Sequence, residues 1–312
     1  MVKAIVDAVD IDPKTGTTLG FYTYGQARPN VLIISAMNGH SATCAYASYQ
    51  IMKHLEQEGS VYGSVTVLPV SNPLAFRLGA RVSPLDSMDL DAVFPGDEQG
   101  TVTQRTAWEI WRRASSTDYV IELRTGWQSC TSHVIAMHRE YIHVRNLATQ
   151  IGFPLVIQST GSRGALTTEA AHEGIPAVTV EMRGDREVDA QAAVEVRESI
   201  LNFLRIKNII LGESMETSAT LAGISRHVSV GSEGFFLPGI HLGEEVKAGD
   251  VIGQVQDKES VTSPYDGTLI SHSPMKYVFE GDMVARIATP LADQGSSQEI
   301  EEDAPPERRR KW

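Results

Sequence analysis

Short apolar runs alternate with segments of helical character over the first two thirds of the chain, and this alternation limits the possible folds more than any other feature. Residues 31–37 (VLIISAM) form an unbroken apolar run of the kind found in a strand that is buried on both faces. Further strands are predicted at residues 65–70, 119–123, 155–157 and 177–181, and helices at 46–55, 104–114, 145–151, 166–173 and 190–204. This order predicts an α/β domain of three layers around a mixed, largely parallel sheet.

The pattern changes after about residue 221, where glycine recurs between short β-like runs such as 251–255 and 267–270. This texture predicts a small all-β, barrel-like module. We therefore divide the chain into an α/β domain at residues 1–212, a C-terminal β domain at 213–292 and a tail at 293–312. The tail is polar and contains an acidic run and a Pro-Pro pair, so we expect it to be disordered.

The composition is that of a soluble globular protein, since 42% of the 312 residues are apolar and 21% are charged. A formal net charge of −12 argues against a nucleic acid or an anionic membrane as a partner. No apolar run approaches the roughly 18 residues that a membrane span needs, and the N-terminus lacks the pattern of a signal peptide. Cys44 and Cys130 are then expected as free thiols in a cytoplasmic protein.

Three polar residues follow the carboxyl ends of predicted strands. Asn38, Arg124 and Glu181 each occupy such a position. In open α/β sheets, ligands bind beyond the carboxyl ends of the strands. We therefore expect these three side chains to lie together at one site.

Five stretches, taken in order, resemble the succinylglutamate desuccinylase/aspartoacylase family. They are the Asn-Pro loop Asn72–Phe76 with Arg81, the run Asp89–Gly96, the strand end Asp118–Gly126, the strand Gly174–Glu181 and the glycine-rich C-terminal module. The resemblance covers roughly residues 25 to 290. It implies a zinc-carboxypeptidase-like fold, hydrolysis of C–N amide bonds in N-acyl amino acids with a zinc cofactor, and Glu181 as the catalytic general base.

The zinc ligands of that family are not carried by this chain. The best alignment places Asn38 and Ser41 on the histidine and glutamate of the His-Gly-x-Glu motif, and Arg124 on the third ligand, a histidine. A shifted alignment, with His40 and Thr43 in the first motif, keeps only one ligand. Amide, hydroxyl and guanidinium groups do not usefully bind zinc. We therefore expect no metal at the family zinc site.

The candidate site combines one residue that the resemblance marks as catalytic with five that could bind substrate. The catalytic candidate is Glu181, and the substrate-binding candidates are Asn38, Ser41, Arg81, Asp91 and Arg124. Asp91 and Ala92 stand where the family has a substrate-facing Asn-Arg pair.

The roles of two of these residues stay open. Without zinc, a carboxylate alone activates water poorly, so a structural pair of Glu181 with Arg124 or Arg183 is favoured over a catalytic role. For Arg81, a ligand contact and a salt bridge to Asp86 or Asp89 are equally compatible with the sequence.

Two classes of function follow. In the first, the chain binds a small anionic amino-acid-derived or N-acyl ligand in a zinc-free pocket, as a pseudoenzyme or partner subunit or with altered chemistry. In the second, it is an active amidohydrolase that uses a relocated metal or a water activated by Glu181. His133, His138 and His143 are the candidates for a relocated metal. A homo-oligomer and a complex with a zinc-bearing paralogue are both considered.

Two further features receive a structural interpretation. Cys130 precedes His133 closely, but a buried thiol is favoured over a nucleophile. The C-terminal module resembles a biotinyl/lipoyl-like barrel with Lys258 near a hairpin tip, and for this module packing or an oligomer contact is favoured over a carrier function.

Overall fold

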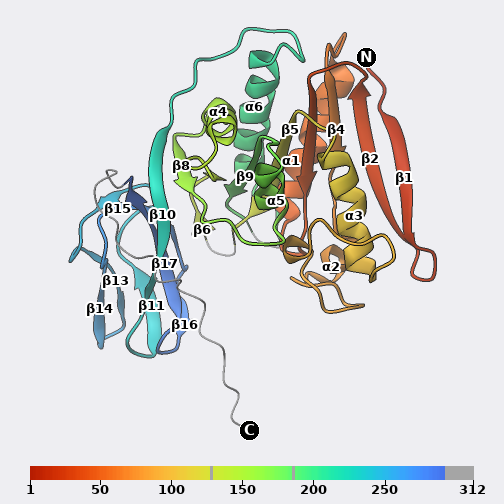
Figure 1. Cartoon of the computed structure of the whole chain (residues 1–312). Coiled ribbons are helices and arrows are strands. Elements are labelled where there is room, and N and C mark those ends of the chain that lie inside the picture. Colours follow the sequence, from red (N-terminus) through yellow and green to blue (C-terminus); the bar gives the residue numbers. More distant parts are fainter. Residues whose placement is uncertain (127–128, 185–186, 292–312) are drawn as a thin grey trace.

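The computed structural model of the chain describes residues 1–126, 129–184 and 187–291. The tail predicted to be disordered, residues 293–312, lies outside the described residues. In Figure 1 an α/β part, with helices on both sides of a twisted sheet, stands beside a smaller β part. The predicted fold class is confirmed: a three-layer α/β arrangement on a mixed sheet, with a β module at the C-terminal end.

Eight strands form the sheet of the α/β part. They are β1 (Ile5–Asp12), β2 (Thr17–Gly25), β3 (Asn30–Ser35), β4 (Ser64–Leu68), β5 (Tyr119–Thr125), β7 (His133–Ala136), β8 (Leu155–Gln158) and β9 (Ala177–Met182). Their order is β1-β2-β4-β3-β5-β9-β7-β8. The central strands β4, β3, β5 and β9 are parallel, whereas β1, β2 and the β9–β7 pair are antiparallel.

Helices cover both faces of this sheet. One face carries α1 (Ala42–Gln57), α4 (Ile142–Ile151) and α6 (Ala190–Ile206), and the other carries α3 (Val102–Ala114) and α5 (Leu166–His172). In β3, Val31 and Ile33 pack into the first core, and Leu32 and Ile34 pack into the second. Because both faces of the strand are buried, its sequence is an unbroken apolar run instead of an alternating one.

The β part continues the main sheet and adds a second one. Its strands are β10 (Thr220–Ser229), β11 (Gly234–Pro238), β12 (Glu245–Val246), β13 (Val251–Val255), β14 (Glu259–Thr262), β15 (Gly267–His272), β16 (Lys276–Val278) and β17 (Met283–Pro290). Strand β10 pairs with β8 on one side and with β17 on the other, so the main sheet runs on into the β part. Within the described residues, β14, β13, β11 and β16 form a separate four-stranded sheet, which shares a small core with β10, β15 and β17.

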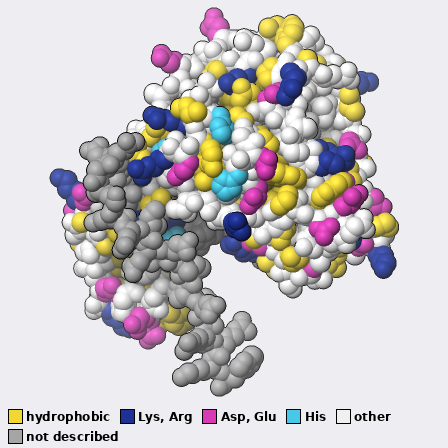
Figure 2. Space-filling view, viewed as in Figure 1, with side chains coloured by type: hydrophobic (Ala, Val, Ile, Leu, Met, Phe, Trp, Pro, Cys, Tyr) yellow, Lys and Arg dark blue, Asp and Glu magenta, His cyan; other side chains and the backbone are white. Residues whose placement is uncertain are grey.

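The β1–β2 hairpin is not predicted from the sequence. Seven of the eight residues of β1 are at least partly exposed on the outer edge of the sheet, and its first four residues are all exposed. Such a strand lacks the apolar run that marks a buried strand. No helix among the described residues has the length and apolarity that crossing a membrane would require. On the face shown in Figure 2, Lys and Arg side chains are interspersed with Asp and Glu side chains.

Candidate functional site

A cavity of about 250 Å³ lies beyond the carboxyl ends of β3, β5 and β9. All six residues proposed from the sequence line it, namely Asn38, Ser41, Arg81, Asp91, Arg124 and Glu181. The expected grouping at the strand ends is therefore observed. Parallel neighbouring strands end at one edge of the sheet, so residues far apart in the sequence meet there.

Strands β5 and β9 supply the floor of the cavity. Glu122 and Arg124 are two residues apart on β5, and their register partners on β9 are Thr179 and Glu181. Side chains two residues apart in a strand point to the same face of the sheet. The four side chains therefore form one polar group that starts in the buried sheet and reaches the cavity.

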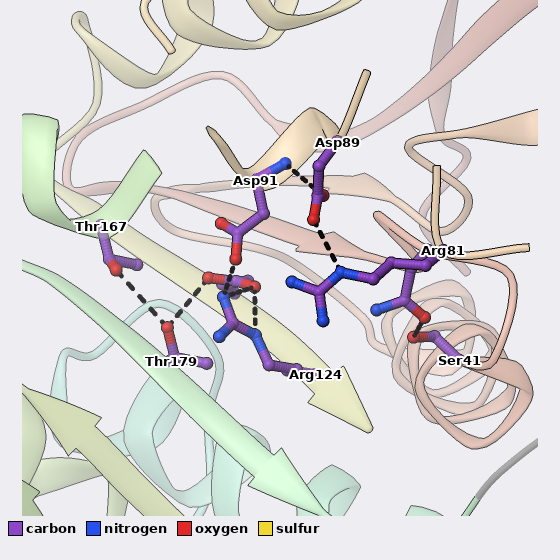
Figure 3. Close-up of polar contacts among 9 residues, drawn as sticks. Ser41, Arg81, Asp89, Asp91, Arg124, Thr167 and Thr179 are labelled. Carbon is purple, nitrogen blue, oxygen red and sulfur yellow. Dashed lines mark hydrogen bonds and ion pairs between the residues drawn. The ribbon is translucent and has the colours of Figure 1, made fainter. Parts of the chain in front are cut away.

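Arg124 is held by two carboxylates (Figure 3). Its Nε and Nη2 donate to Oε1 of Glu122 at 3.0 and 2.8 Å, and its Nη2 also donates to Oδ2 of Asp91 at 2.5 Å. The Thr179 hydroxyl donates to the second oxygen of Glu122 at 2.9 Å. Burial opposes the charge of Arg124, but Glu122 and Asp91 together raise the pKa of its guanidinium, so it stays charged.

Asp91 has an unusual environment for a carboxylate. Its Oδ1 is buried and has no hydrogen-bond partner, while Oδ2 faces Arg124. Burial is the main cause that raises the pKa of Asp91 to about 7, with Arg124 opposing it and Glu122 adding to it. The cavity contains four carboxylates, those of Asp89, Asp91, Glu122 and Glu181, and three guanidiniums. Asp91 therefore titrates near neutral pH, so the cavity changes there between equal numbers of charged groups of each sign and one excess negative charge.

Glu181 pairs with Arg286, which corrects the expectation that Arg124 or Arg183 would be its partner. Arg286 extends from β17 of the β part and donates through Nη2 to Oε1 of Glu181, and its Nε donates to the Ser271 hydroxyl at 3.0 Å. Arg183 instead pairs with acidic residues of the α6 region. Burial is the largest single influence and acts to raise the pKa of Glu181, but the surrounding groups, Arg286 foremost, together outweigh it and hold that pKa below its usual value. The β part therefore contributes directly to the site.

His133 lies behind this pair, fully buried. Its Nδ1 lies 2.8 Å from the Thr131 carbonyl oxygen, and its Nε2 is 3.8 Å from Oε1 of Glu181, without a hydrogen-bond partner. Burial lowers the pKa of His133 despite the nearby carboxylate. A neutral imidazole therefore donates from Nδ1 to the carbonyl.

The turn after β3 positions Asn38 and Ser41. The Asn38 side-chain oxygen accepts hydrogen bonds from the His40 backbone N–H and the Ser41 hydroxyl, both at 3.0 Å. Ser41 directly precedes α1, but its side chain donates a hydrogen bond to Asn38 and makes no cap bond to the helix. Gly39 lies so close to the neighbouring loop that a Cβ would be 2.2 Å from the Ala75 carbonyl oxygen, so only glycine fits there.

Arg81 stands at the mouth of the cavity. Its Nε donates to Oδ2 of Asp89 at 2.9 Å, which selects Asp89 over Asp86 as its partner. Asp86 instead accepts from the backbone and side chain of Thr103. The Arg81 side chain is 77% exposed, and in Figure 3 its guanidinium extends toward Asp91 and Arg124. Arg81 is therefore more accessible to a ligand than Arg124.

The residues that the family resemblance aligns with the zinc ligands do not have the chemistry of a zinc site. Asn38 and Ser41, whose side chains are hydrogen-bonded to each other, align with the first motif. The charged guanidinium of Arg124 aligns with the third ligand. A structural or catalytic zinc site needs at least three imidazole, thiolate or carboxylate ligands, and a fixed positive charge repels the metal. Among residues 1–126, 129–184 and 187–291 there is no group of three His, Cys, Asp or Glu side chains that could hold a metal ion.

The alternative features found in the sequence do not converge on a second centre. His133 and His138 bond to separate carbonyl oxygens, those of Thr131 and Ala222. Burial raises the pKa of the Cys130 thiol to about 12, so this thiol is not a nucleophile near neutral pH. Lys258 lies in the β13–β14 hairpin, and its amine donates to a backbone carbonyl oxygen at 2.8 Å.

Sequence reasoning did not find Arg286, Glu122 or Asp89 as parts of the cavity. Arg286 comes from the β part, and only the three-dimensional arrangement brings it to Glu181. Glu122 carried a detectable signal, because it is a charged residue within a predicted buried strand, two positions before Arg124. A buried charge requires a partner, and the residue two positions along the same strand face is the nearest candidate.

The comparisons with known proteins agree on the family. Residues 27–207 match the model of the succinylglutamate desuccinylase/aspartoacylase catalytic domain. An N-alpha-acetyl-L-2,4-diaminobutyric acid deacetylase of Halomonas elongata is 25% identical over 288 residues, which cover 86% of this chain and 84% of that protein.

Solved structures agree on the fold. The product-bound ectoine utilization protein EutE (DoeB) of Ruegeria pomeroyi has a TM-score of 0.79 at 21% identity, over 92% of this chain and 95% of its own. An aspartoacylase family protein of Mesorhizobium loti has a TM-score of 0.77 at 20% identity, over 94% and 96%. Since the family model spans more than half of the chain, the protein belongs to the succinylglutamate desuccinylase/aspartoacylase family, whose members are deacylases of N-acyl amino acids.

Proposed function

We propose that this chain is a zinc-free member of its family, and that its cavity binds a small N-acyl or amino-acid-derived ligand that carries a carboxylate. The observation that carries the proposal is the fixed position of the Arg124 guanidinium between two carboxylates. The alignment with the family pairs Arg124 with a zinc-binding histidine, and Glu122 and Asp91 hold its guanidinium in the cavity. In this proposal a permanent positive charge from the chain itself replaces the charge of the metal.

The environment of Glu181 supports binding over hydrolysis. A general base is effective when its pKa lies near the working pH. Arg286 holds the pKa of Glu181 below its usual value, and the same carboxylate oxygen is occupied by the ion pair. Glu181 is therefore a weak base here, and in the proposal it serves as the counter-ion of Arg286.

The ligand class follows from the accessible polar groups and from the relatives. Arg81 offers a largely exposed guanidinium at the cavity mouth, and a guanidinium recognises a carboxylate through paired hydrogen bonds. The amide of Asn38 lines the same cavity and can meet an amide or acyl oxygen. The curated relative acts on an N-acetylated amino acid, so N-acetyl amino acids are the first ligands to consider.

The proposal places the protein in the cytoplasm, as a ligand-binding pseudoenzyme or as the partner subunit of a zinc-bearing paralogue. The second candidate is an active deacylase in which Glu181 activates a water without zinc. The presence of Glu181 on the cavity wall is the observation in its favour. The ion pair with Arg286 is the observation against it.

A ligand panel distinguishes these functions. N-acetyl amino acids, their free amino acids and their amides are tested by isothermal titration, and acetate release is measured in parallel. Binding of carboxylate-bearing N-acyl compounds without acetate release supports the proposal, and turnover supports the second candidate. The absence of binding by every compound at millimolar concentration would overturn the proposed ligand class.

Arg81→Gln provides the matched variant. A hydrogen bond between charged groups contributes about 1.5–3 kcal/mol, so the loss of the guanidinium should weaken binding by roughly 10- to 100-fold. The free energy of unfolding should change little, because the Arg81 side chain is 77% exposed. A ligand analogue with an amide in place of the carboxylate should bind the unmodified protein about as weakly as the ligand binds the Arg81→Gln variant. For this analogue, Arg81→Gln should cause no further loss of affinity.

A further inference from the structure

The Asn38 side chain offers only hydrogen-bond donors to the ligand cavity. Its oxygen accepts from the His40 backbone N–H and from the Ser41 hydroxyl, both at 3.0 Å, and Figure 3 shows the bond from Ser41. A backbone N–H can only donate, so the atom that faces it must be the amide oxygen and not the amide nitrogen. Asn38 lines the cavity, and the polar atom that it leaves for a ligand is therefore the amide nitrogen.

The turn that carries Asn38 is held firmly in place. The Gly39 backbone N–H donates to the Ala80 carbonyl oxygen at 2.7 Å, and the Ser41 side chain is buried. The space beside Gly39 is too small for a Cβ, so the neighbouring loop packs tightly against the turn. The amide of Asn38 is therefore oriented before a ligand binds, which lowers the entropic cost of a hydrogen bond to it.

The carboxylates of the cavity are already paired with arginines. Each of the four bonds to a guanidinium, in the pairs Asp89–Arg81, Asp91–Arg124, Glu122–Arg124 and Glu181–Arg286. An ammonium group that enters the cavity has to compete with these arginines for its acceptors. An oxygen acceptor on the ligand can instead use the N–H groups that the cavity lining still offers.

Two of these donors suit the two ends of an N-acyl amino acid. The exposed guanidinium of Arg81 carries the charge that suits a carboxylate, and the neutral amide of Asn38 matches the uncharged carbonyl oxygen of an acyl group. Met37, the residue before Asn38, also lines the cavity and provides apolar surface for the rest of the acyl group. A free amino acid has an ammonium in place of the acyl group, and an ammonium has only donors.

We propose that Asn38 determines specificity for the acyl group by donating from its amide nitrogen to the acyl carbonyl oxygen, and that Ser41 is the positioning residue that holds this amide. The inference rests on the proposed function and adds the reason why the cavity selects an acylated amino acid over the free one. The ammonium of the free compound sets donors against the donors of Asn38. A site built to bond one polar group rejects an analogue that lacks it, because its own polar groups are left unpaired.

Matched pairs of ligands test the contact by isothermal titration of the full chain. The N-acetyl derivatives of alanine, aspartate and 2,4-diaminobutyrate are compared with their N-thioacetyl analogues, in which sulfur replaces the carbonyl oxygen. Because sulfur is a weak hydrogen-bond acceptor, the N-thioacetyl compound should bind about 3- to 10-fold more weakly than its N-acetyl counterpart. The free amino acid should bind more weakly than the N-acetyl compound as well.

Asn38→Asp removes the donor and keeps the turn. The new carboxylate still accepts from His40 and Ser41, but it has no N–H group for the acyl oxygen. The variant should lose the preference for the N-acetyl over the N-thioacetyl compound. Its affinity ratio between the N-acetyl compound and the free amino acid should fall at least about tenfold, because a carboxylate attracts an ammonium.

Ser41→Ala tests the positioning role, with Ser48→Ala as its matched control. Both hydroxyls are buried, and the Ser48 hydroxyl makes one bond of 2.9 Å to Ser35, away from the residues that line the cavity. A purely structural role of Ser41 predicts the same ligand preference in both variants. We expect Ser41→Ala alone to reduce the N-acetyl preference, because only the His40 N–H then holds the amide.

The possible results separate this inference from the proposed function. Equal affinity for N-acetyl and N-thioacetyl compounds in the unmodified protein would overturn the role of Asn38 and leave the proposed ligand class intact. So would a full preference in Asn38→Asp, with circular dichroism showing that the variant is folded. An unchanged preference in Ser41→Ala would overturn the positioning role. If none of the three N-acetyl compounds binds at millimolar concentration, the proposed function fails and this inference fails with it.

Discussion

The ion pair between Arg286 and Glu181 connects the β part to the α/β part, and Arg286→Met probes it directly. Methionine keeps an unbranched apolar stem of similar length but removes the charge. The side chains of Arg286 and Glu181 are only 11% and 6% exposed, so solvent screens the pair little. Removing one partner of a buried pair costs about 3–5 kcal/mol, because the remaining charge stays buried without compensation.

We expect the loss of stability caused by Arg286→Met to lie at the lower end of that range. Arg124 also lowers the pKa of Glu181, so part of the compensation survives in the variant. We therefore expect a loss of about 3 kcal/mol in the free energy of unfolding at pH 8, measured by urea denaturation. Such a loss is a large part of the 5–15 kcal/mol that a folded protein typically has.

The pH dependence identifies the charge as the cause. In the original protein the pKa of Glu181 lies below its ordinary 4.5, so its contribution to stability is present above that pH and is lost as the pH falls through the lowered value. Without Arg286 the pKa of Glu181 rises. The stability difference between protein and variant should then shrink as the pH is lowered from 8 toward 5, because Glu181 becomes protonated at little cost.

A double-mutant cycle and an exposed pair provide the controls. In a Glu181→Gln background, Arg286→Met should cost much less than in the original protein. Arg28→Met removes a partner of Asp118, but its side chain is 73% exposed, so we expect a much smaller loss of stability than for Arg286→Met. The reasoning is refuted if Arg286→Met costs no more than Arg28→Met, or if its cost is the same with Gln at position 181.

Three further predictions concern single groups. The pKa of Asp91 is raised from 3.8 to about 7, so the free energy of unfolding should fall as the pH rises between these values. Asp91→Asn should remove that fall when urea denaturation is measured at pH 5 to 8. The same dependence of stability on pH in the variant would contradict the raised pKa. Gly39→Ala should cost about 2 kcal/mol or more in thermal unfolding, because its Cβ would overlap the Ala75 carbonyl oxygen, and a neutral effect would contradict the tight loop contact. Burial raises the pKa of Cys44 and of Cys130 to about 12, so neither should react with iodoacetamide at pH 8 until the protein unfolds, and rapid native labelling would show an open site.

The sequence predicted the layers of the fold because burial on two faces leaves a clear pattern. The strand at 30–35 and the helix at 190–206 were predicted within a few residues of their observed ends. The hairpin β1–β2 was missed, since an exposed edge strand has no such pattern. The position of Asn38, Arg124 and Glu181 at strand ends correctly predicted that they share one cavity.

The partners of the site residues could be predicted only in part. Asp89 was one of two candidates for Arg81, and its proximity in the sequence made the guess possible. The partner of Glu181 was predicted wrongly, because Arg286 is 105 residues away and reaches the site only through the pairing of β10, β17 and β15. A contact between residues so far apart in the sequence depends on how the two parts of the chain pack together, and sequence patterns do not reveal that packing.

The central claim is that this family member holds an arginine-centred pocket where its relatives hold zinc, and metal analysis tests it most directly. The untagged protein is incubated with excess zinc, desalted and measured by elemental mass spectrometry, while circular dichroism confirms that it is folded. Arg124 with its two carboxylate partners predicts zinc far below one ion per chain. A folded protein that retains close to one zinc per chain would contradict the account and would return the chain to the zinc-dependent deacylases.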